Sequence, residues 1–418
     1  MPADPSRVLA DLADLRTLTS NADGAQRVAF TPVWQQARIW FRTKLNALPV
    51  EQHVDAAGNL WATLRGRSPL SIVLGSHLDS IPGGGWLDGC LGVLTGLEIL
   101  RSLADTYKDG PPFTIRLVDW ADEEGARFGR SLFGSSAFAG TLRFDEDRFR
   151  TDADGNTLEK ALRACDIDID RIADAERERT DIAAYLELHI EQGPILEMLG
   201  TPIGAVLGTK GVERHTVTFL GESAHSGSTP MASRHDAFAC AARFALELRS
   251  IAGRHPDAVS TIGAVKTSPG IVTAIVGRCD VTLDQRDLDA DVLQSMLTEA
   301  HESSRRIARE EGCFVEWSHT MSIEPIPFHP ELIALCEEAI AEVGCSPCRL
   351  PSGPLHDAAE VARVGIPTAM MFVNSIGGIS HNKIEDTRTA DLSLAIRAFD
   401  VLATKTLRWM EGRCVETS

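Results

Sequence analysis

The spacing of hydrophobic positions changes several times along this chain, and these changes predict a mixed α/β fold. The first fifty residues carry apolar residues at helical spacing, in VLADLADL and TPVWQQARIWFRTKLNAL, and predict helices. A further helical pattern covers 92–105. Short apolar runs bounded by turn residues are typical of buried strands: SIVLGSH (71–77), FTIRLVDW (113–120), AYLELHI (184–190) and TAMMFVN (368–374). Strands that alternate with helices favour a mixed, mostly parallel sheet.

Residues 212–328 follow a different order, which predicts an inserted second domain. Strands are expected at 215–221, 260–267, 277–287 and 313–321, and helices at 235–252 and 290–312. This βαββαβ order is that of a ferredoxin-like sandwich. The first domain would then be discontinuous, formed by 1–211 and 329–418. Residues 142–180 are charged and irregular, and we expect them to be a solvated surface excursion.

Composition narrows the classes of partner. The net charge of −18 argues against a nucleic-acid surface, which needs basic side chains to neutralise phosphates. No run reaches the roughly 18–20 apolar residues that span a membrane, and the first residues lack a basic patch followed by an apolar stretch. Nine dispersed cysteines suit reduced thiols. We therefore expect a cytoplasmic protein without nucleic-acid or membrane partners.

One cysteine pair has the spacing of a possible metal or redox site. Cys345 and Cys348 form the only C-x-x-C motif of the chain. A structural zinc site would need a second pair or nearby histidines. We expect two incidental thiols in a loop, with the zinc and redox alternatives left open.

Side chains that can bind metal occur in a fixed order, each beside glycine or at the end of an apolar run. Taken singly, each has an ordinary explanation, since strand-end histidines are usually structural and Asp-Gly is usually a turn. Their joint order over some three hundred residues favours a binuclear metal centre: His77, Asp88, Glu123 with Glu124, His189 and His381. His381 lies beyond the insertion, so only a discontinuous domain brings the set together.

The residue types suit amide hydrolysis. Two divalent ions roughly 3.5–4 Å apart activate water and polarise a carbonyl, and they need a bridging carboxylate with ligands on either side. Imidazole and carboxylate ligands without thiolate suit zinc, manganese, cobalt or nickel. Asp79, two residues after His77, is placed to orient that imidazole. Neighbouring Glu123 and Glu124 can diverge, so that one binds metal and the other acts as general base.

Seven segments resemble the amidase, hydantoinase/carbamoylase family, within the aminoacylase and carboxypeptidase-like metallopeptidases. The resemblance covers about residues 70–390, and LHIEQGP is its most diagnostic part because it separates this branch from ordinary dipeptidases. The segments are GSHLDS, WLDGCLGVLTGLE, ADEEGARFG, LELHIEQGPILE, HSGSTPMASRHDA, LPSGPLHDAA and GGISHNKIEDT. The family includes N-carbamoyl-L-amino-acid hydrolases, allantoate amidohydrolases and β-ureidopropionases.

The resemblance implies a catalytic domain of the zinc-exopeptidase type and a role for each matching residue. His77, Asp88 and His189 would hold one metal ion, and Asp88 would bridge to a second held by Glu124 and His381. Glu123 would be the general base. The inserted domain would join a homodimer and close on the substrate, with His225 reaching the partner's active site. The implied substrate contacts are Gln192, His225, Thr273, Arg286, Gly353 and Gly378.

Departures from the family pattern cluster in the segments that face substrate. GIVTAIVGR has Thr273 and Val276 where relatives commonly have an asparagine before Pro-Gly. LPSGPLHDA has Pro354 and Leu355 in place of small residues, and Asn374 replaces a frequent proline. The altered segments are 271–277, 352–356 and 372–379, whereas every implied metal position is intact.

These observations lead to one main hypothesis and several alternatives. We expect a binuclear-metal amidohydrolase that cleaves the amide of an N-carbamoyl or similar N-acyl L-amino acid. The alternatives are an allantoate or other ureido-acid hydrolase, a hydrolase of an unusual N-acyl amino acid, and a dipeptidase. A non-catalytic binding protein is least favoured, because Glu123 is retained.

Overall fold

The computed structural model describes residues 2–416, with side chains through Arg413, and the chain divides into two units. The first unit contains the residues up to Leu207 together with those from Phe328 onward. The second unit is Gly208–Pro327. The chain therefore leaves the first unit once and returns to it, as an inserted domain requires.

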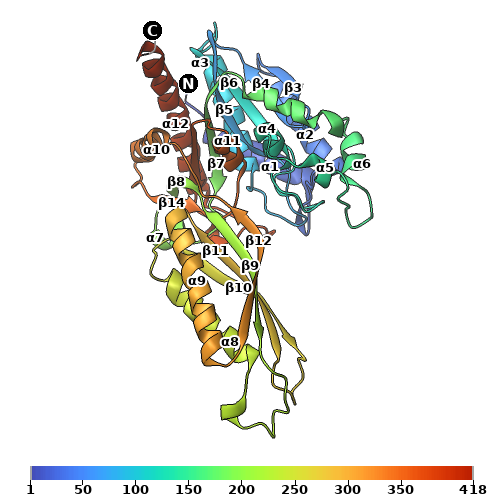
Figure 1. The fold of residues 1–418 in the computed structure, drawn as a ribbon. Coiled ribbons are helices and arrows are strands. Elements are labelled where there is room, and N and C mark those ends of the chain that lie inside the picture. Colours follow the sequence, from blue (N-terminus) through green and yellow to red (C-terminus); the bar gives the residue numbers. More distant parts are fainter. Residues whose placement is uncertain (1, 417–418) are drawn as a thin grey trace. The chain divides into compact units, whose positions relative to one another are not determined.

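The first unit is built on a mixed sheet with the strand order β8-β15-β7-β5-β6-β4-β3, and β14 pairs with β8 (Figure 1). The central strands β15, β7, β5 and β6 are parallel, and the outer strands are antiparallel. The strands are β3 (Glu51–Val54), β4 (Leu60–Leu64), β5 (Ser68–His77), β6 (Phe113–Trp120), β7 (Ile182–Ile190), β8 (Ile203–Thr209), β14 (Arg349–Ser352) and β15 (Thr368–Val373).

The four predicted strands of this domain are confirmed as the parallel core of the sheet. Every residue of β6 and β15 is buried. Parallel strands are covered on both faces by crossover helices, so they appear in a sequence as continuous apolar runs. The antiparallel strands β3 and β4 were not predicted, because they are short and β3 is largely exposed.

Helices cover this sheet. The predicted helices near the N-terminus form as α1 and α2, each with a capping side chain, Asp4 or Thr31, and a proline in the first turn. The helices of the first unit are α1 (Pro5–Thr19), α2 (Pro32–Leu45), α3 (Cys90–Thr106), α4 (Phe133–Ala139), α5 (Phe144–Asp147), α6 (Leu158–Arg163), η1 (Ile169–Arg179), α7 (Ile195–Leu199), α10 (Pro330–Glu342), α11 (Asp357–Arg363), η3 (Ile376–Gly378) and α12 (Thr389–Glu416); β1 (Ser20–Asn21) and β2 (Gly24–Ala25) pair separately.

The strand order reverses direction at β5. The chain runs from β5 to its neighbour β6 through α3, and then returns across β5 to β7. Right-handed crossovers in opposite directions place their helices on opposite faces of a sheet. Open α/β sheets bind their ligands at the carboxyl ends of the strands where the order reverses, which in this sheet are the ends of β5, β6 and β7.

The prediction of a solvated excursion at 142–180 is wrong. This segment forms α5, α6 and η1, and its sparse apolar residues join a small core with residues of α2 and α4. Leu158, Leu162, Ile169 and Ile172 are almost fully buried there. Charged residues separate these apolar positions, and α5 and α6 are too short to show a helical period.

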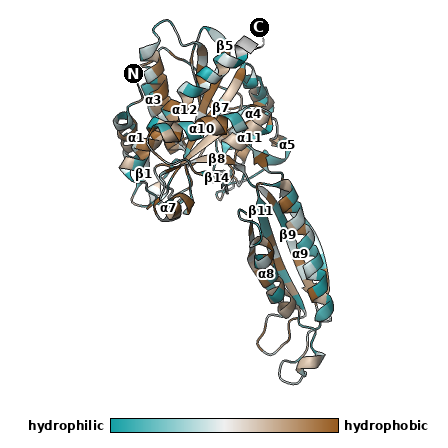
Figure 2. Ribbon diagram, turned by 90° about the vertical axis from the view of Figure 1, so that its left-hand side faces the viewer, coloured by the Kyte–Doolittle hydropathy of each residue, from teal (hydrophilic) through white to brown (hydrophobic). Residues whose placement is uncertain are grey.

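The second unit has the predicted βαββαβ order. Its antiparallel sheet has the order β10-β11-β9-β12, and α8 and α9 contribute to its separate core. Figure 2 shows hydrophobic and hydrophilic residues side by side along α9, as expected of an amphipathic helix. The elements are β9 (Gly211–Leu220), η2 (Met231–Ser233), α8 (Ala237–Ala252), β10 (Val259–Ser268), β11 (Arg278–Asp287), α9 (Ala290–Glu310), β12 (Phe314–Ile323) and β13 (Ile326–Pro327), which pairs with the end of β8.

The structure also bears on two expectations drawn from composition, the lack of a membrane span and the state of the C-x-x-C cysteines. No helix within residues 2–416 is long and apolar enough to cross a lipid bilayer. Cys345 and Cys348 are free thiols of intermediate exposure in the loop between α10 and β14.

Candidate metal centre

Three adjacent parallel strands end at candidate metal residues. His77 is the last residue of β5, and His189 is the penultimate residue of β7. Glu123 and Glu124 follow β6 after a short turn. Because β7, β5 and β6 are neighbours, their carboxyl ends bring these side chains to one place, the point at which the strand order reverses.

Asp88 reaches the same place because the chain bends sharply at Gly89, just before α3. Gly89 has φ 65°, and a Cβ there would lie 2.4 Å from the carbonyl oxygen of His77. Only glycine combines that backbone angle with so close an approach. The loop after β5 therefore folds back onto the strand end, and Asp88 becomes buried beside His77.

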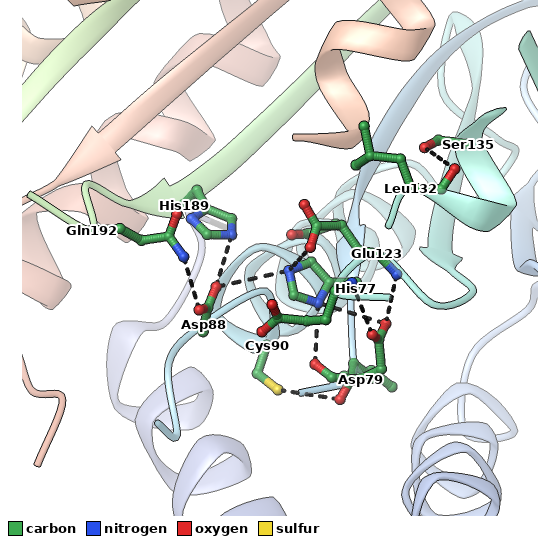
Figure 3. Close-up of polar contacts among 12 residues, drawn as sticks. His77, Asp79, Asp88, Cys90, Glu123, Leu132, Ser135, His189 and Gln192 are labelled. Atoms are coloured by element: carbon green, nitrogen blue, oxygen red, sulfur yellow. Dashed lines mark hydrogen bonds and ion pairs between the residues drawn. The ribbon is translucent and has the colours of Figure 1, made fainter. Parts of the chain in front are cut away.

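The two oxygens of Asp88 face different sets of ligands. Its Oδ1 lies 3.2 Å from His189 Nε2 and 3.8 Å from His77 Nε2 (Figure 3). Its Oδ2 lies 3.5 Å from His381 Nε2, and Glu124 Oε2 is 3.2 Å from that same nitrogen. The ligand atoms of each set, His77–Asp88–His189 and Asp88–Glu124–His381, lie within 4.8 Å of one another. These are the two sets that the family resemblance implies.

Hydrogen bonds orient the two buried imidazoles. His77 Nδ1 donates to the carbonyl of Asp79 at 3.1 Å, and His189 Nδ1 donates to the carbonyl of Ile190 at 2.9 Å. A carbonyl can only accept, so each Nδ1 carries the hydrogen and each Nε2 is left for another partner. His77 Nε2 is buried without a hydrogen-bond partner among the described residues, and Asp88 Oδ1 lies 3.2 Å from His189 Nε2. Two imidazole nitrogens directed at one shared carboxylate fit a divalent cation.

Glu123 and Glu124 diverge between the two sets. Glu123 Oε2 lies 3.7 Å from His77 Nε2, whereas Glu124 faces His381. Burial, together with the charges of Asp357 and Glu124, raises the pKa of Glu123 well above its usual range. A buried carboxyl with a raised pKa beside a metal-capable pair is typical of a proton-transfer group.

Asp79 acts through two different groups. Its backbone carbonyl, rather than its carboxylate, makes the hydrogen bond to His77, and the nearest carboxylate oxygen is 3.7 Å from the ring. The carboxylate instead accepts the backbone N–H groups of Glu123 and Glu124, both at 3.2 Å (Figure 3). Asp79 thus connects the end of β5 to the turn after β6.

The histidines differ in protonation in the absence of metal. Burial lowers the pKa of His77 to about 3. Burial opposes protonation of His189 too, but its contact with Asp88 outweighs burial and raises the pKa to about 9. The contact with Glu124 raises the pKa of His381 to about 9. His189 and His381 are therefore cations that a metal ion would have to deprotonate.

Several residues of the centre have strained backbones. Asp122, Gln192 and His381 have φ values of 56°, 57° and 53°, a left-handed region that non-glycine residues seldom occupy. Such conformations persist where the surroundings hold them, and they gather at functional sites. Here they direct the Glu123–Glu124 turn, Gln192 and His381 to one place.

Gln192 and Gly378 lie beside the Asp88 set. Gln192 Nε2 donates to Asp88 Oδ2 at 2.9 Å, and Gln192 N donates to Ser375 Oγ. A Cβ at Gly378 would lie 2.8 Å from Pro194 N, so glycine lets η3 pack on the backbone that follows Gln192. Gly353 is half-buried in the turn after β14.

The remaining predicted contacts lie in the second unit. His225 is exposed and pairs with Ala274, and Ser226 N donates to the carbonyl of Thr273, so these two loops lie together. Arg286, near the end of β11, donates to Asp284 at 2.8 Å.

Sequence reasoning missed several buried residues of the centre, among them Glu385, His356 and Glu187, the last two of which form a third metal-capable group with His189. Glu385 accepts the N–H groups of Leu87 and Asp88, both at 3.1 Å, and its Oε2 lies 2.9 Å from Ser380 Oγ. His356 packs on His189 with ring centroids 4.4 Å apart. His356 lies in the motif segment LPSGPLHDAA and Glu385 in GGISHNKIEDT. Neither residue is spaced from another potential ligand in a way that would have marked it in the sequence.

Comparisons with known proteins show the family to which this chain is similar. The model of peptidase family M20/M25/M40 matches residues 73–405. The allantoate amidohydrolase of Escherichia coli is 34% identical over 93% of this chain and 94% of its own. The N-carbamoyl-L-amino acid amidohydrolase of Geobacillus stearothermophilus is 34% identical over 89% of this chain and 90% of its own.

A solved structure has the same fold. The amidase of the hydantoinase/carbamoylase family from Burkholderia multivorans superposes with a TM-score of 0.88 at 32% identity. The match covers 96% of this chain and 97% of that one.

Proposed function

This chain belongs to peptidase family M20/M25/M40, in its hydantoinase/carbamoylase amidase branch, and on that premise we propose that it hydrolyses the amide of an N-carbamoyl or similar N-acyl L-amino acid. The family assignment makes it an amidohydrolase, which acts on C–N bonds other than peptide bonds. The observation that carries the proposal is the pair of ligand sets that share the two oxygens of Asp88.

We assign the metal ligands from these sets. His77 and His189 would hold one divalent ion and Glu124 and His381 a second, with Asp88 between them. Bound there, two such ions supply an acidified water and a polarised carbonyl. Zinc, manganese, cobalt and nickel all suit this donor set of imidazoles and carboxylates.

Glu123 is the proposed general base. It accepts a proton from the attacking water and returns it to the leaving nitrogen, so that this nitrogen leaves as a neutral amine rather than as an anion. Its raised pKa suits both transfers, because the carboxyl holds the proton between them. A carbamoyl substrate would yield the amino acid, carbon dioxide and ammonia.

We further propose roles for the two units. The first unit is the catalytic domain, and the second is a domain for dimerisation and closure over the substrate. Arg286 offers a planar guanidinium to a substrate carboxylate, in exchange for its contact with Asp284. His225 and Thr273, on adjoining loops, are the other contacts proposed from this unit. The substrate contacts proposed from the first unit are Gln192, Gly353 and Gly378.

The substrate is tested with a panel on protein loaded with each metal in turn. N-carbamoyl-L-methionine, allantoate and a dipeptide are compared by kcat/KM. We expect the carbamoyl amino acid to be the best substrate. Preference for allantoate would favour the ureido-acid alternative, which the similarity to the E. coli enzyme supports. Preference for the dipeptide would overturn the proposal.

Replacing the base separates chemistry from metal binding. Glu123→Gln removes proton transfer but keeps the size of the side chain, and we expect kcat to fall by about 10²–10⁴-fold. Metal content, measured by elemental analysis, should stay near that of the unchanged protein. A variant with normal kcat would remove Glu123 from this role.

A further inference from the structure

A fully buried arginine contacts the loop that joins two of the proposed metal ligands, His77 and Asp88. This residue, Arg27, lies shortly after β2 and is 0% exposed. A guanidinium keeps its charge inside a protein, and burying a charge is costly unless other groups compensate it. The three oxygens nearest to its side-chain nitrogens are neutral, two backbone carbonyls and one hydroxyl. An apolar side chain would fill the same space without this cost, so we attribute the use of arginine to its hydrogen bonds.

The guanidinium reaches both ends of the loop. Its Nε donates to the carbonyl of Leu78, directly after His77, at 2.8 Å. Its Nη2 lies 3.5 Å from the carbonyl of Gly85, shortly before Asp88. Its Nη1 donates to Oγ1 of Thr19 at 3.2 Å, at the end of α1. The side chain therefore ties the loop to the N-terminal helix.

The backbone of Arg27 holds the same loop. Its N–H donates to Oγ of Ser80 at 3.1 Å, and its carbonyl accepts the N–H of Ser80 at 3.1 Å. Together with the bond from Nε to Leu78, these contacts hold the residues on either side of Asp79. A carbonyl turns only with its whole peptide plane, so fixing both neighbours fixes the direction of the Asp79 carbonyl.

Asp79 connects these contacts to the metal centre. Its carbonyl accepts from His77 Nδ1 and so leaves Nε2 directed at Asp88. Partners of this kind, which fix the orientation of a metal-binding imidazole, contribute to metal affinity without touching the ion. Arg27 acts one step further away, because it holds the backbone that carries the orienting carbonyl.

We propose that Arg27 is a positioning residue for the metal centre: by holding the backbone on both sides of Asp79, it keeps His77 in the orientation that binds a metal ion. It touches neither the ion nor the substrate in this role. The inference rests on the function proposed above, because it takes His77 to be a metal ligand.

The affinity of the full chain for Co²⁺, measured without substrate after removal of bound metal, tests this role. Arg27→Met removes the donors but keeps a chain of similar length, and we expect the affinity to fall about 10–100-fold. The visible absorption of bound Co²⁺, which depends on the geometry of its ligands, should change as well. Arg27→Lys keeps a donor for the Leu78 carbonyl and should recover part of the lost affinity.

Arg116→Met is the matched control, because it removes another buried arginine that donates to a backbone carbonyl. Arg116 donates to the carbonyl of Glu178 at 2.8 Å, and its side chain also pairs with the Glu178 carboxylate. Unfolding of both metal-free methionine variants in urea gives the loss of stability separately from the loss of metal. We expect Arg116→Met to lose stability but to keep the Co²⁺ affinity and the absorption spectrum of the parent protein.

Thr19→Val tests the same contact through a smaller change, which is the decisive one if Arg27→Met does not fold. It removes the acceptor of Arg27 Nη1 and keeps the shape of the side chain. We expect the Co²⁺ affinity to fall about threefold, because one hydrogen bond contributes modestly.

Three results would overturn the proposal. They are an unchanged Co²⁺ affinity in Arg27→Met or Thr19→Val, an equal loss of affinity in Arg27→Met and Arg116→Met, and no recovery of affinity in Arg27→Lys. A parent protein that binds no Co²⁺ would contradict the proposed metal centre itself, so the failure of the proposed function is distinguishable from the failure of this inference.

Discussion

Asp88 is the residue on which both ligand sets depend. Its position is held from three sides, by Gln192 and Ser380 on Oδ2 and by Glu385 through the backbone N–H. Burial alone would raise its pKa, but the neighbouring imidazoles lower it well below its usual value. An ionised carboxylate held in this way is ready to take two cations without moving.

Glu385 is predicted to be a positioning residue for Asp88. Glu385→Ala leaves the N–H groups of Leu87 and Asp88 without their acceptor, and we expect metal affinity to fall about 10–100-fold, as is usual for residues that support ligands. Affinity is measured by competition with a chelator.

Glu385→Gln is the matched control for this prediction. Its amide oxygen still accepts the two N–H groups, and its NH₂ can donate to Ser380 Oγ. The loss of affinity should therefore be much smaller than for alanine. If the two variants lose affinity equally, the acceptor role is wrong.

The residue types of the centre could be predicted from sequence, but several contacts could not. Histidine at the end of an apolar run indicates His77 and His189, and the family resemblance supplies the two sets. By contrast, the backbone carbonyl of Asp79, and not its carboxylate, orients His77. Every residue type has a backbone carbonyl, so this contact could not be predicted from the sequence. His356 and Glu385 depend on packing between segments far apart in the chain.

At the scale of elements, the turn into α3 links the sheet to the centre. Gly89 permits this turn in two ways, by its positive φ and by its contact with the His77 carbonyl. Gly200, which ends α7, has a similar φ of 68°, but a Cβ there would meet nothing within 4 Å. Comparing substitutions at Gly89 and Gly200 therefore distinguishes the cost of backbone strain from the cost of steric overlap.

Gly89→Ala is expected to be more destabilising than Gly200→Ala. A left-handed alanine costs about 1–2 kcal/mol in either case. The overlap at Gly89 adds about 1–3 kcal/mol and displaces Asp88 or His77. The free energy of unfolding in urea, measured with metal content, checks both parts. Equal destabilisation by the two variants, with metal retained, would contradict this account of the turn.

The predictability of elements follows their burial and length. β5, β6, β7 and β15 are continuous apolar runs because both of their faces are covered, so the sequence shows them directly. The segment at 142–180 hides its core residues among charges, in helices of four to six residues and a 3₁₀ stretch. The two short helices show no helical period, and the buried residues of η1, Ile169, Ile172 and Ala175, recur every third residue rather than at α-helical spacing.

At the scale of the whole molecule, the metal-free protein should lose stability as pH rises. The folded pKa values of His189 and His381, about 9, lie above the ordinary value of 6.5. A raised pKa stabilises the fold fully below pH 6.5, and this contribution disappears as pH rises through about 9. Burial raises the pKa of Glu123 and Glu124, which acts in the same direction.

This prediction is checked by thermal melting between pH 6.5 and 9.5, with and without metal. The chelated protein should melt at progressively lower temperature across this range. Metal binding requires deprotonated ligands, so the loaded protein should show a smaller decline and its metal affinity should rise with pH. A chelated protein whose melting is independent of pH would contradict the protonation of the two histidines.

Because of the insertion, the proposed ligands of the two sets are synthesised at different times. His77, Asp88 and His189 all precede the second unit, whereas His381 follows it. During synthesis on the ribosome, the first set emerges complete well before the second can close. A nascent or prematurely ended chain would thus be limited to a single ion, and the two-ion centre would form only after the inserted unit had been made.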